Sequence, residues 1–219
     1  MDQKSLTVGV LGPKGSYTEQ AALCYFKDCD IIDNYLSPQD IIEDVSRLVI
    51  DYGVVPVENS IQGGVASTID ALIKYRVNIV GEIVLPINHV LAAHPKAEFF
   101  RCVLSHEQAL NQCKDYLKAE YPHCALEPTA STSLAAKIVS EKEIADALVI
   151  CSEHAAKTYK LKIIAKHIAS TNNNETRFFV IGNSTAKPTV HDKTSIVFGL
   201  IDRPVSYTHL RAHETSLHL

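Results

Sequence analysis

The chain lacks any apolar stretch approaching the roughly 20 residues that would span a membrane. The first apolar run, Leu6–Leu11, is too short for a signal-peptide core, and no cleavage site follows it. There is no basic stripe, aromatic–basic repeat or zinc-finger spacing, so nucleic acid is a poor candidate partner. These absences predict a soluble, cytoplasmic protein that binds neither membranes nor nucleic acid.

The sequence also lacks paired cysteines and histidines in a ligand spacing. Its six cysteines include no CxxC pair, and its ten histidines form no convincing metal motif. We therefore expect reduced, mostly buried thiols and no metal site. The net charge of −4 and the 46% hydrophobic content are ordinary for a globular protein of 219 residues, which is long enough for one large α/β domain or two small lobes.

Short apolar runs alternate with helical patterns along most of the chain. The clearest helix covers Pro38–Val49, where the apolar residues share one face. Such alternation predicts an α/β fold with largely parallel sheets. The apolar segment Ile79–Ala93, interrupted by Pro86, indicates a crossing between two lobes, and Ala169–Asn174 indicates a second one. The predicted strands are Thr7–Leu11, Ile31–Tyr35, Tyr52–Val57, Ile79–Leu85, His89–Ala93, Cys102–Leu104, Ala125–Glu127, Ala147–Ile150, Lys162–Ile168 and Phe178–Ile181.

Serine or threonine follows several of these strands just before a predicted helix. Ser16 with Glu19 fits a capping box, and Ser105 with Gln108 fits a second one. Thr129–Ser133 and Ser152 occupy the same kind of junction. Each alone is more often a helix cap than a site. Their repetition predicts a cleft lined by hydroxyls and backbone donors, which suits a small organic anion.

Three further patterns have both a functional and an ordinary structural interpretation. Glu58 and Asn59 follow a buried strand, where ligands bind α/β sheets, although a polar turn has the same composition. Gln112 lies seven residues after Ser105, nearly two helical turns, although glutamines are commonly solvated. The guanidinium of Arg177 suits a carboxylate ligand, or equally an acidic side chain of the protein.

Taken in order, several segments resemble the prephenate dehydratase family. They are GPKGSYTEQAA, VPVENSIQGGV, LPINHVL, SHEQALNQC, STSLAA and NETRF, which together run from Gly12 to Phe178. The resemblance implies a two-lobed α/β fold similar to type II periplasmic binding proteins, with the active site in the cleft between the lobes. One departure is Glu107, where members of the family commonly carry proline; its place in a first helical turn suggests little effect.

The resemblance also implies a reaction and its residues. Prephenate loses its ring carboxylate as CO₂ and its C4 hydroxyl as water, giving phenylpyruvate, without a metal or cofactor. Thr176 matches the proton donor to the departing hydroxyl, and Arg177 is expected to engage a substrate carboxylate. The expected supporting positions are Glu58, Asn59, Ser105 and Gln112, with Ser131 and Thr132 as weaker anion contacts. A homodimer is expected from the family alone.

The resemblance also suggests the domain boundaries. The catalytic domain is expected over 1–182, with one lobe of about 1–80 plus 171–182 and the other of about 81–170. A linker over 183–193 then precedes residues 194–203, which resemble the truncated start of an ACT regulatory domain, and allosteric feedback is in doubt. Residues 204–219 resemble read-through of a cloning or adaptor sequence, with a natural polar tail as the alternative.

Three other functions stay open at this point. Arogenate dehydratase differs only in an amino group that replaces the side-chain keto group of the substrate. A non-catalytic module that binds small anions would use the same fold. A regulatory sensor is the third, although the short ACT-like segment argues against it.

Overall fold

The computed structural model describes residues 5–170, 173–186, 188–190 and 192–196. The chain divides into two compact units, Met1–Ala186 and Lys187–Leu219. In the second unit, the backbone N–H and the hydroxyl of Thr189 donate to the carboxylate of Asp192, at 2.8 and 2.6 Å. Most of the predicted ACT start, 194–203, and all of the predicted tail, 204–219, lie outside the described residues.

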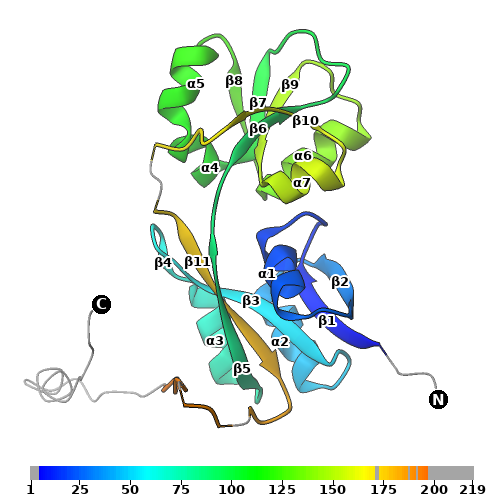
Figure 1. Ribbon diagram of the computed structural model, residues 1–219, viewed down its shortest axis with the longest axis vertical. Coiled ribbons are helices and arrows are strands. Elements are labelled where there is room, and N and C mark those ends of the chain that lie inside the picture. Colours follow the sequence, from blue (N-terminus) through cyan, green and yellow to red (C-terminus); the bar gives the residue numbers. More distant parts are fainter. Residues whose placement is uncertain (1–4, 171–172, 187, 191, 197–219) are drawn as a thin grey trace, which may run out of the picture. The chain divides into compact units, whose positions relative to one another are not determined.

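The first unit contains two β-sheets (Figure 1). The first sheet has the order β2-β1-β3-β11-β5, with the short β4 paired to β3. Strand β1 runs parallel to β2 and β3, whereas β11 runs antiparallel to β3 and β5. The strands are β1 (Leu6–Leu11), β2 (Cys29–Tyr35), β3 (Tyr52–Asn59), β4 (Gly63–Gly64), β5 (Asn78–Pro86) and β11 (Glu175–Gly182).

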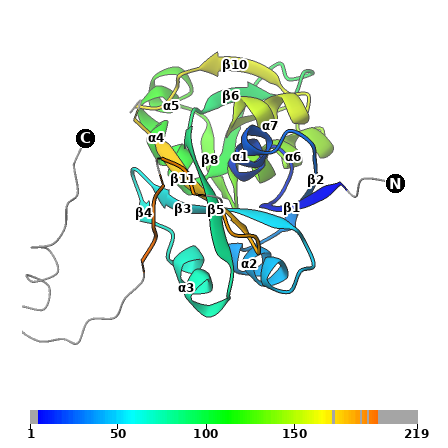
Figure 2. The same cartoon turned by 60° about the horizontal axis from the view of Figure 1, so that its bottom comes forward.

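Helices cover both faces of the first sheet (Figure 2). Helix α1 (Tyr17–Tyr25) packs on one face, and α2 (Pro38–Ser46) and α3 (Ala66–Lys74) pack on the other. Alternation along β3 explains this arrangement, because Val54 contacts the α1 side and Val55 contacts the α2 side. Both are fully buried, which is why this strand reads as a continuous apolar run in the sequence.

The second sheet has the order β10-β6-β9-β7-β8 and is covered in the same way. Helices α4 and α5 pack on one face, and α6 and α7 pack on the other. Its strands are β6 (Val90–Ala93), β7 (Cys102–His106), β8 (Ala125–Thr129), β9 (Ala147–Cys151) and β10 (Lys162–Lys166). The helices are α4 (Glu107–Gln112), α5 (Lys114–Glu120), α6 (Thr132–Glu141) and α7 (Glu153–Thr158).

The two-lobed α/β class is confirmed, but the expectation of largely parallel sheets is wrong. Each sheet is mixed, with β7 parallel to β8 and β9 and β6 antiparallel to β9 and β10. The antiparallel strands are mainly those next to the passages between sheets, namely β5, β6, β10 and β11. A strand that arrives from the other sheet has no helical crossover to return it in the parallel direction.

The two passages between the sheets lie close to the expected segments. The chain leaves the first sheet after Pro86 and enters the second at Val90, so the change of sheet falls after the boundary expected near residue 81. It returns between Lys166 and Glu175, a segment in which residues 171–172 are not described.

Two smaller results concern the membrane and cysteine predictions. Within the described part of the chain, no helix has the length and apolar character needed to cross a membrane. All six cysteines are free thiols, but they are less buried than expected, since only Cys113 and Cys151 are fully buried and Cys24 is exposed.

Candidate active site

A cavity of about 890 Å³ is lined by residues from both sheets of the first unit. Leu11 and Asn59 come from the carboxyl ends of β1 and β3, and His106 comes from the carboxyl end of β7. Thr176 at the start of β11 and Ser131 before α6 complete this part of the lining. The volume suits a small organic molecule, and the strand ends are where α/β sheets bind their ligands.

Helix α1 begins at the cavity with a modified capping box. The hydroxyl of Ser16 accepts from the backbone N–H of Glu19 at 3.1 Å and donates to the carbonyl of Leu11 at 2.7 Å. The predicted reciprocal bond is displaced by one residue, because the Glu19 carboxylate accepts from the N–H of Gly15. Gly15 has a φ of +80°, a conformation natural for glycine, and this turn presents its N–H to Glu19.

Helix α6 also begins at the cavity. The hydroxyl of Ser131 accepts from the backbone N–H of Leu134 at 3.1 Å, as expected for an N-cap, and both Ser131 and Thr132 line the cavity. The first N–H groups of a helix have no intrahelical partner, and the helix dipole favours negative charge there. The N-termini of α1 and α6 therefore both favour an anion in this cavity.

Thr176 and Asn59 form a direct pair across β11 and β3. The side-chain N–H of Asn59 donates to the hydroxyl oxygen of Thr176 at 2.9 Å. The Asn59 oxygen accepts from the backbone N–H groups of Ile61 and Gln62 at 3.0 and 3.1 Å, which fixes the orientation of the amide. This bond uses the oxygen of Thr176 and not its proton, so the hydroxyl can donate to a ligand in the cavity.

Hydrogen bonds extend from this pair to Gln112 in α4, on the second sheet, and back to Tyr17 in α1, on the first. Asn59 donates to the Asn174 side-chain oxygen at 2.8 Å, and Asn174 donates to the Gln112 oxygen at 3.2 Å. The same Gln112 oxygen lies 3.1 Å from Nε2 of His89, whose Nδ1 lies 3.1 Å from the Tyr17 hydroxyl. With Thr176 at its other end, six side chains from distant parts of the sequence thus form one hydrogen-bonded chain.

Burial keeps His89 and Tyr17, at one end of the hydrogen-bonded chain, uncharged. It lowers the pKa of His89, an effect that the hydrogen bond to Gln112 partly opposes, and it raises the pKa of the Tyr17 phenol well above its usual value. Both side chains are therefore neutral near pH 7. The phenol retains its proton and can donate it to the His89 ring or to the carbonyl of Asn88, 2.7 Å away.

The lowered pKa of His89 predicts a dependence of stability on pH. An unfolded histidine takes up a proton as the pH falls below about 6.5, before folded His89 does, so the free energy of unfolding decreases on acidification through this range. The loss ends once folded His89 is also protonated. Urea unfolding between pH 8 and pH 5 should show a shallower decrease for His89→Gln than for the wild type; equal slopes would contradict the assignment.

Ser105 does not line the cavity. It is fully buried, and its hydroxyl donates to the carbonyl of Ile150 in β9 at 2.6 Å. Strand β7 extends to His106, whose ring nitrogen caps α4 by accepting from the N–H of Gln108 at 3.3 Å. The capping box predicted from Ser105 is therefore wrong, and the helical spacing to Gln112 does not apply because Ser105 belongs to the strand.

Glu58 and Arg177 lie outside the cavity lining. Arg177 follows Thr176 on β11, and successive strand residues point to opposite faces, so the buried Thr176 and the exposed Arg177 diverge. The guanidinium lies 3.6 Å from a carboxylate oxygen of Glu58 and 3.9 Å from one of Glu82. Of the predicted residues, the structure thus brings Asn59, Ser131, Thr132 and Thr176 to the cavity, with Gln112 hydrogen-bonded behind them.

Sequence reasoning missed several residues that the structure places at the site. Tyr17, His89 and Asn174 line the cavity and belong to the hydrogen-bonded chain, and all three stood inside quoted motifs without an assigned role. Lys14 and Lys137 are lysines of the lining that were also missed. Among the described residues, no cluster of histidine, cysteine or acidic side chains is arranged to hold a metal ion.

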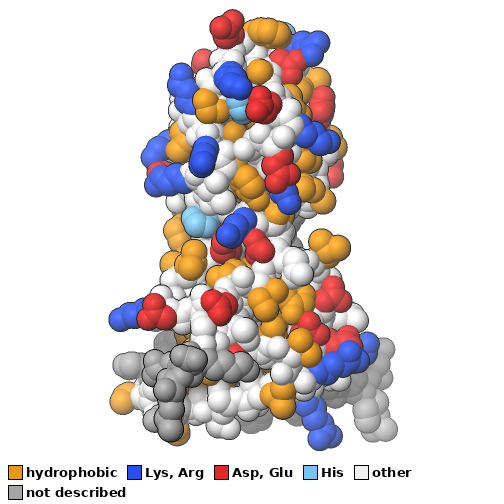
Figure 3. Space-filling view, turned by 90° about the vertical axis from the view of Figure 1, so that its right-hand side faces the viewer, with side chains coloured by type: hydrophobic (Ala, Val, Ile, Leu, Met, Phe, Trp, Pro, Cys, Tyr) orange, Lys and Arg blue, Asp and Glu red, His pale blue; other side chains and the backbone are white. Residues whose placement is uncertain are grey.

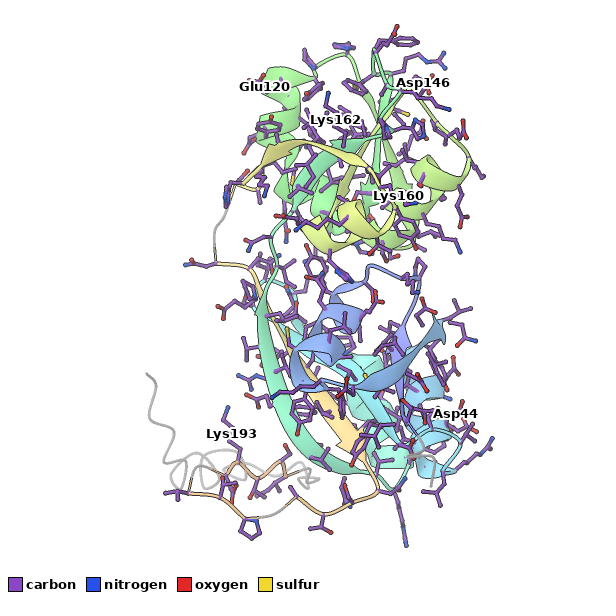
Figure 4. All side chains as sticks on the ribbon, turned by 45° about the vertical axis from the view of Figure 1, so that its right-hand side comes forward. Asp44, Glu120, Asp146, Lys160, Lys162 and Lys193 are labelled. Carbon is purple, nitrogen blue, oxygen red and sulfur yellow. The ribbon has the colours of Figure 1, made fainter. Side chains whose placement is uncertain are left out.

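Acidic and basic side chains are interspersed on the face shown in Figure 3, so neither sign is concentrated there. Asp146, labelled in Figure 4, precedes β9 and pairs with Arg101, whereas the opposite end of the second sheet contributes to the cavity. The cavity lining itself holds two acidic side chains, Asp33 and Glu141, and Glu141 lies 3.8 Å from Lys137. The attraction for an anion there comes from the helix N-termini and Lys14.

Comparisons with known proteins show which proteins this chain is similar to. The prephenate dehydratase family model matches residues 8–186. A bifunctional chorismate mutase/prephenate dehydratase from Aquifex aeolicus is 42% identical over 203 residues, covering 92% of this chain and 56% of that protein. Arogenate dehydratase/prephenate dehydratase 1 from Arabidopsis thaliana is 34% identical over 209 residues, covering 93% of this chain and 52% of that protein.

A solved structure gives the same result. Prephenate dehydratase from Arthrobacter aurescens, determined in complex with L-Phe, superimposes with a TM-score of 0.77 at 28% identity, covering 85% of this chain and 63% of that one. The chain spans about half the length of the curated relatives it matches. The match of the family model over most of the chain, together with 42% identity to one relative, shows that this chain belongs to the prephenate dehydratase family.

Proposed function

We propose that this chain converts prephenate to phenylpyruvate, with release of CO₂ and water. The observation that carries the proposal is the Thr176 hydroxyl at the cavity, whose oxygen accepts a hydrogen bond from Asn59. This bond orients the hydroxyl and leaves its proton for a ligand. Membership of the prephenate dehydratase family supports the same reaction.

The reaction needs one proton and no redox step. The bond between the ring and its carboxylate breaks, and its electron pair completes the aromatic ring as CO₂ departs. The bond from C4 to oxygen breaks at the same time, and the departing hydroxide takes the proton of Thr176 to become water. Solvent then returns a proton to Thr176. Formation of the aromatic ring drives the reaction, so a weak acid such as threonine suffices when it is well positioned.

The substrate is a dianion, and the cavity offers several partners for its carboxylates. The N-termini of α1 and α6, with Ser131 and Thr132, provide hydrogen-bond donors and a favourable dipole. Lys14 adds positive charge, whereas the charge of Lys137 is offset by Glu141, 3.8 Å away. The contact predicted between Arg177 and a carboxylate stays a prediction; its ion pairs with Glu58 and Glu82 on the other side of β11 do not favour it.

Lys14 is expected to contribute to substrate binding rather than to turnover. It is exposed at the cavity, and Lys14→Met should raise KM for prephenate by about fivefold, equivalent to the ~1 kcal/mol upper range for an exposed ion pair, with kcat little changed. Lys162→Met is the matched control, because Lys162 begins β10 away from the cavity lining (Figure 4). A larger KM increase for the control than for Lys14→Met would remove Lys14 from the binding site.

Arogenate dehydratase is the second candidate, favoured by the name of the Arabidopsis relative. The two substrates differ only at the side-chain carbon that carries a keto or an amino group. Parallel measurements of kcat/KM with prephenate and L-arogenate would separate them. We expect prephenate to be the better substrate, and a higher value for arogenate would reassign the function. A homodimer and a cytoplasmic location both stay predictions.

A further inference from the structure

His89 occupies the passage between the two sheets and contacts helices of both. It lies between β5 and β6 and is only 5% exposed. One ring nitrogen lies 3.1 Å from the hydroxyl of Tyr17 in α1, and the other lies 3.1 Å from the oxygen of Gln112 in α4. The rings of His89 and Tyr17 also pack edge to face, with centroids 6.1 Å apart.

The direction of each hydrogen bond between Asn59 and His89 follows from the fixed orientation of the Asn59 amide. Two backbone N–H groups donate to the Asn59 oxygen, so the nitrogen of Asn59 faces Thr176 and Asn174, with the carbonyl of Glu175 as a third acceptor at 3.1 Å. The Asn174 oxygen accepts from Asn59, so the Asn174 nitrogen must donate to Gln112. The oxygen of Gln112 therefore faces His89, and Nε2 of His89 must carry a proton to meet it.

The orientation of Gln112 leaves one of its polar atoms without a hydrogen bond. Among the described residues, its side-chain nitrogen is buried without a hydrogen-bond partner, which is unfavourable for a polar group. Turning the amide over would place its N–H groups against those of Asn174, donor against donor. Acceptance from both Asn174 and His89 is what holds the Gln112 oxygen in place.

We propose that His89 is a positioning residue for Thr176, acting through Gln112, Asn174 and Asn59. The Nε2–H of His89 holds the Gln112 oxygen, which orients Asn174, and Asn174 in turn helps to hold the Asn59 nitrogen against the oxygen of Thr176. The Thr176 proton then points away from Asn59 and is free to be donated. The proposal rests on the proposed function, because it assigns His89 to the donation of that proton.

Two variants separate the contribution of the Nε2–H group to turnover from that of the imidazole ring's volume. In His89→Gln the side-chain nitrogen reaches close to the position of Nε2 and can donate to Gln112, whereas in His89→Asn it reaches only as far as Nδ1. Both lose the ring packing against Tyr17. We expect His89→Asn to lower kcat by about tenfold or more, since misplacing a reacting group by ~1 Å costs up to ~10²-fold, with KM little changed. His89→Gln should recover most of this loss.

A second comparison tests the connection to Thr176. Combining His89→Asn with Thr176→Ala should lower kcat no further than Thr176→Ala alone, because no hydroxyl is left to position. Equal kcat losses in His89→Asn and His89→Gln, or losses that multiply in the double variant, would overturn the proposal.

The tautomer of His89 gives a readout that does not depend on turnover. Long-range ¹H–¹⁵N NMR spectra of the full chain, with His89→Gln used to assign the signal, should show Nε2 protonated and Nδ1 bare near neutral pH. Protonation at Nδ1 would overturn the positioning proposal even if prephenate is turned over. The expected tautomer in a chain that does not turn over prephenate would instead count against the proposed function.

Discussion

Thr176→Ala is expected to lower kcat for prephenate by about 10²–10⁴-fold, the usual contribution of a positioned proton donor, with KM changed only slightly. The hydroxyl lies at the cavity and accepts from Asn59, so its loss removes the only proton donor assigned to the departing hydroxide. The groups that we propose to bind the substrate, Lys14 and the N-termini of α1 and α6, are left in place by the substitution. Steady-state kinetics with prephenate near neutral pH would measure both constants.

Thr176→Ser is the matched control for this prediction. Serine keeps the hydroxyl that Asn59 binds and loses only a methyl group, so it should retain much of the turnover that alanine loses. Near-normal turnover in Thr176→Ala would remove Thr176 from its role as the acid. A loss in Thr176→Ser as large as that in Thr176→Ala would show that the methyl group matters as much as the hydroxyl.

Gly15→Ala is expected to have the largest effect on stability. Gly15 has a φ of +80°, and a Cβ added there would lie 2.7 Å from Cα and 2.9 Å from Cβ of Ala155 in α7. The left-handed conformation costs about 1–2 kcal/mol for an alanine, and overpacking typically adds about 1–3 kcal/mol. Because the clash is with backbone, the N-termini of α1 and α7 must move apart, which strains the bond from the Ser152 hydroxyl to the Gly15 carbonyl.

Gly63→Ala is the control that separates the effect of close packing on stability from the effect of the left-handed conformation. Gly63 also has a φ of +80°, but an added Cβ would meet nothing within 4 Å. Its substitution should therefore cost only the conformational strain, about 1–2 kcal/mol, while Gly15→Ala costs about 2–5 kcal/mol in total. Urea unfolding of both variants, with equal m-values, measures the difference. Equal losses of unfolding free energy would show that α7 does not constrain Gly15.

The elements that could be predicted from the sequence are those set by local patterns. Strands such as β3 and β9 are buried on both faces, so each forms an unbroken apolar run with recognisable ends. Strand direction was predicted incorrectly because it depends on where the chain passes between sheets, which no local pattern records. Strand β4 was missed because two residues, Gly63 and Gly64, carry no periodicity.

The part of the site that could be predicted also depends on local sequence motifs. Asn59 and Thr176 stand in motifs at strand ends, and the pairing of β3 with β11 places them opposite each other. Strand alternation could have separated Thr176 from Arg177 in advance, because neighbouring strand residues point to opposite faces. The contacts of His89 with Tyr17 and Gln112 join segments far apart in the sequence, so only the folded structure could show them.

The most direct test of the proposed reaction is the yield of phenylpyruvate and CO₂ from prephenate incubated with the purified chain near neutral pH, corrected for an enzyme-free blank. We predict catalytic turnover, with one molecule of each product formed for each prephenate consumed. Binding of prephenate by the folded chain without product would contradict the account and would favour a module that only binds small anions.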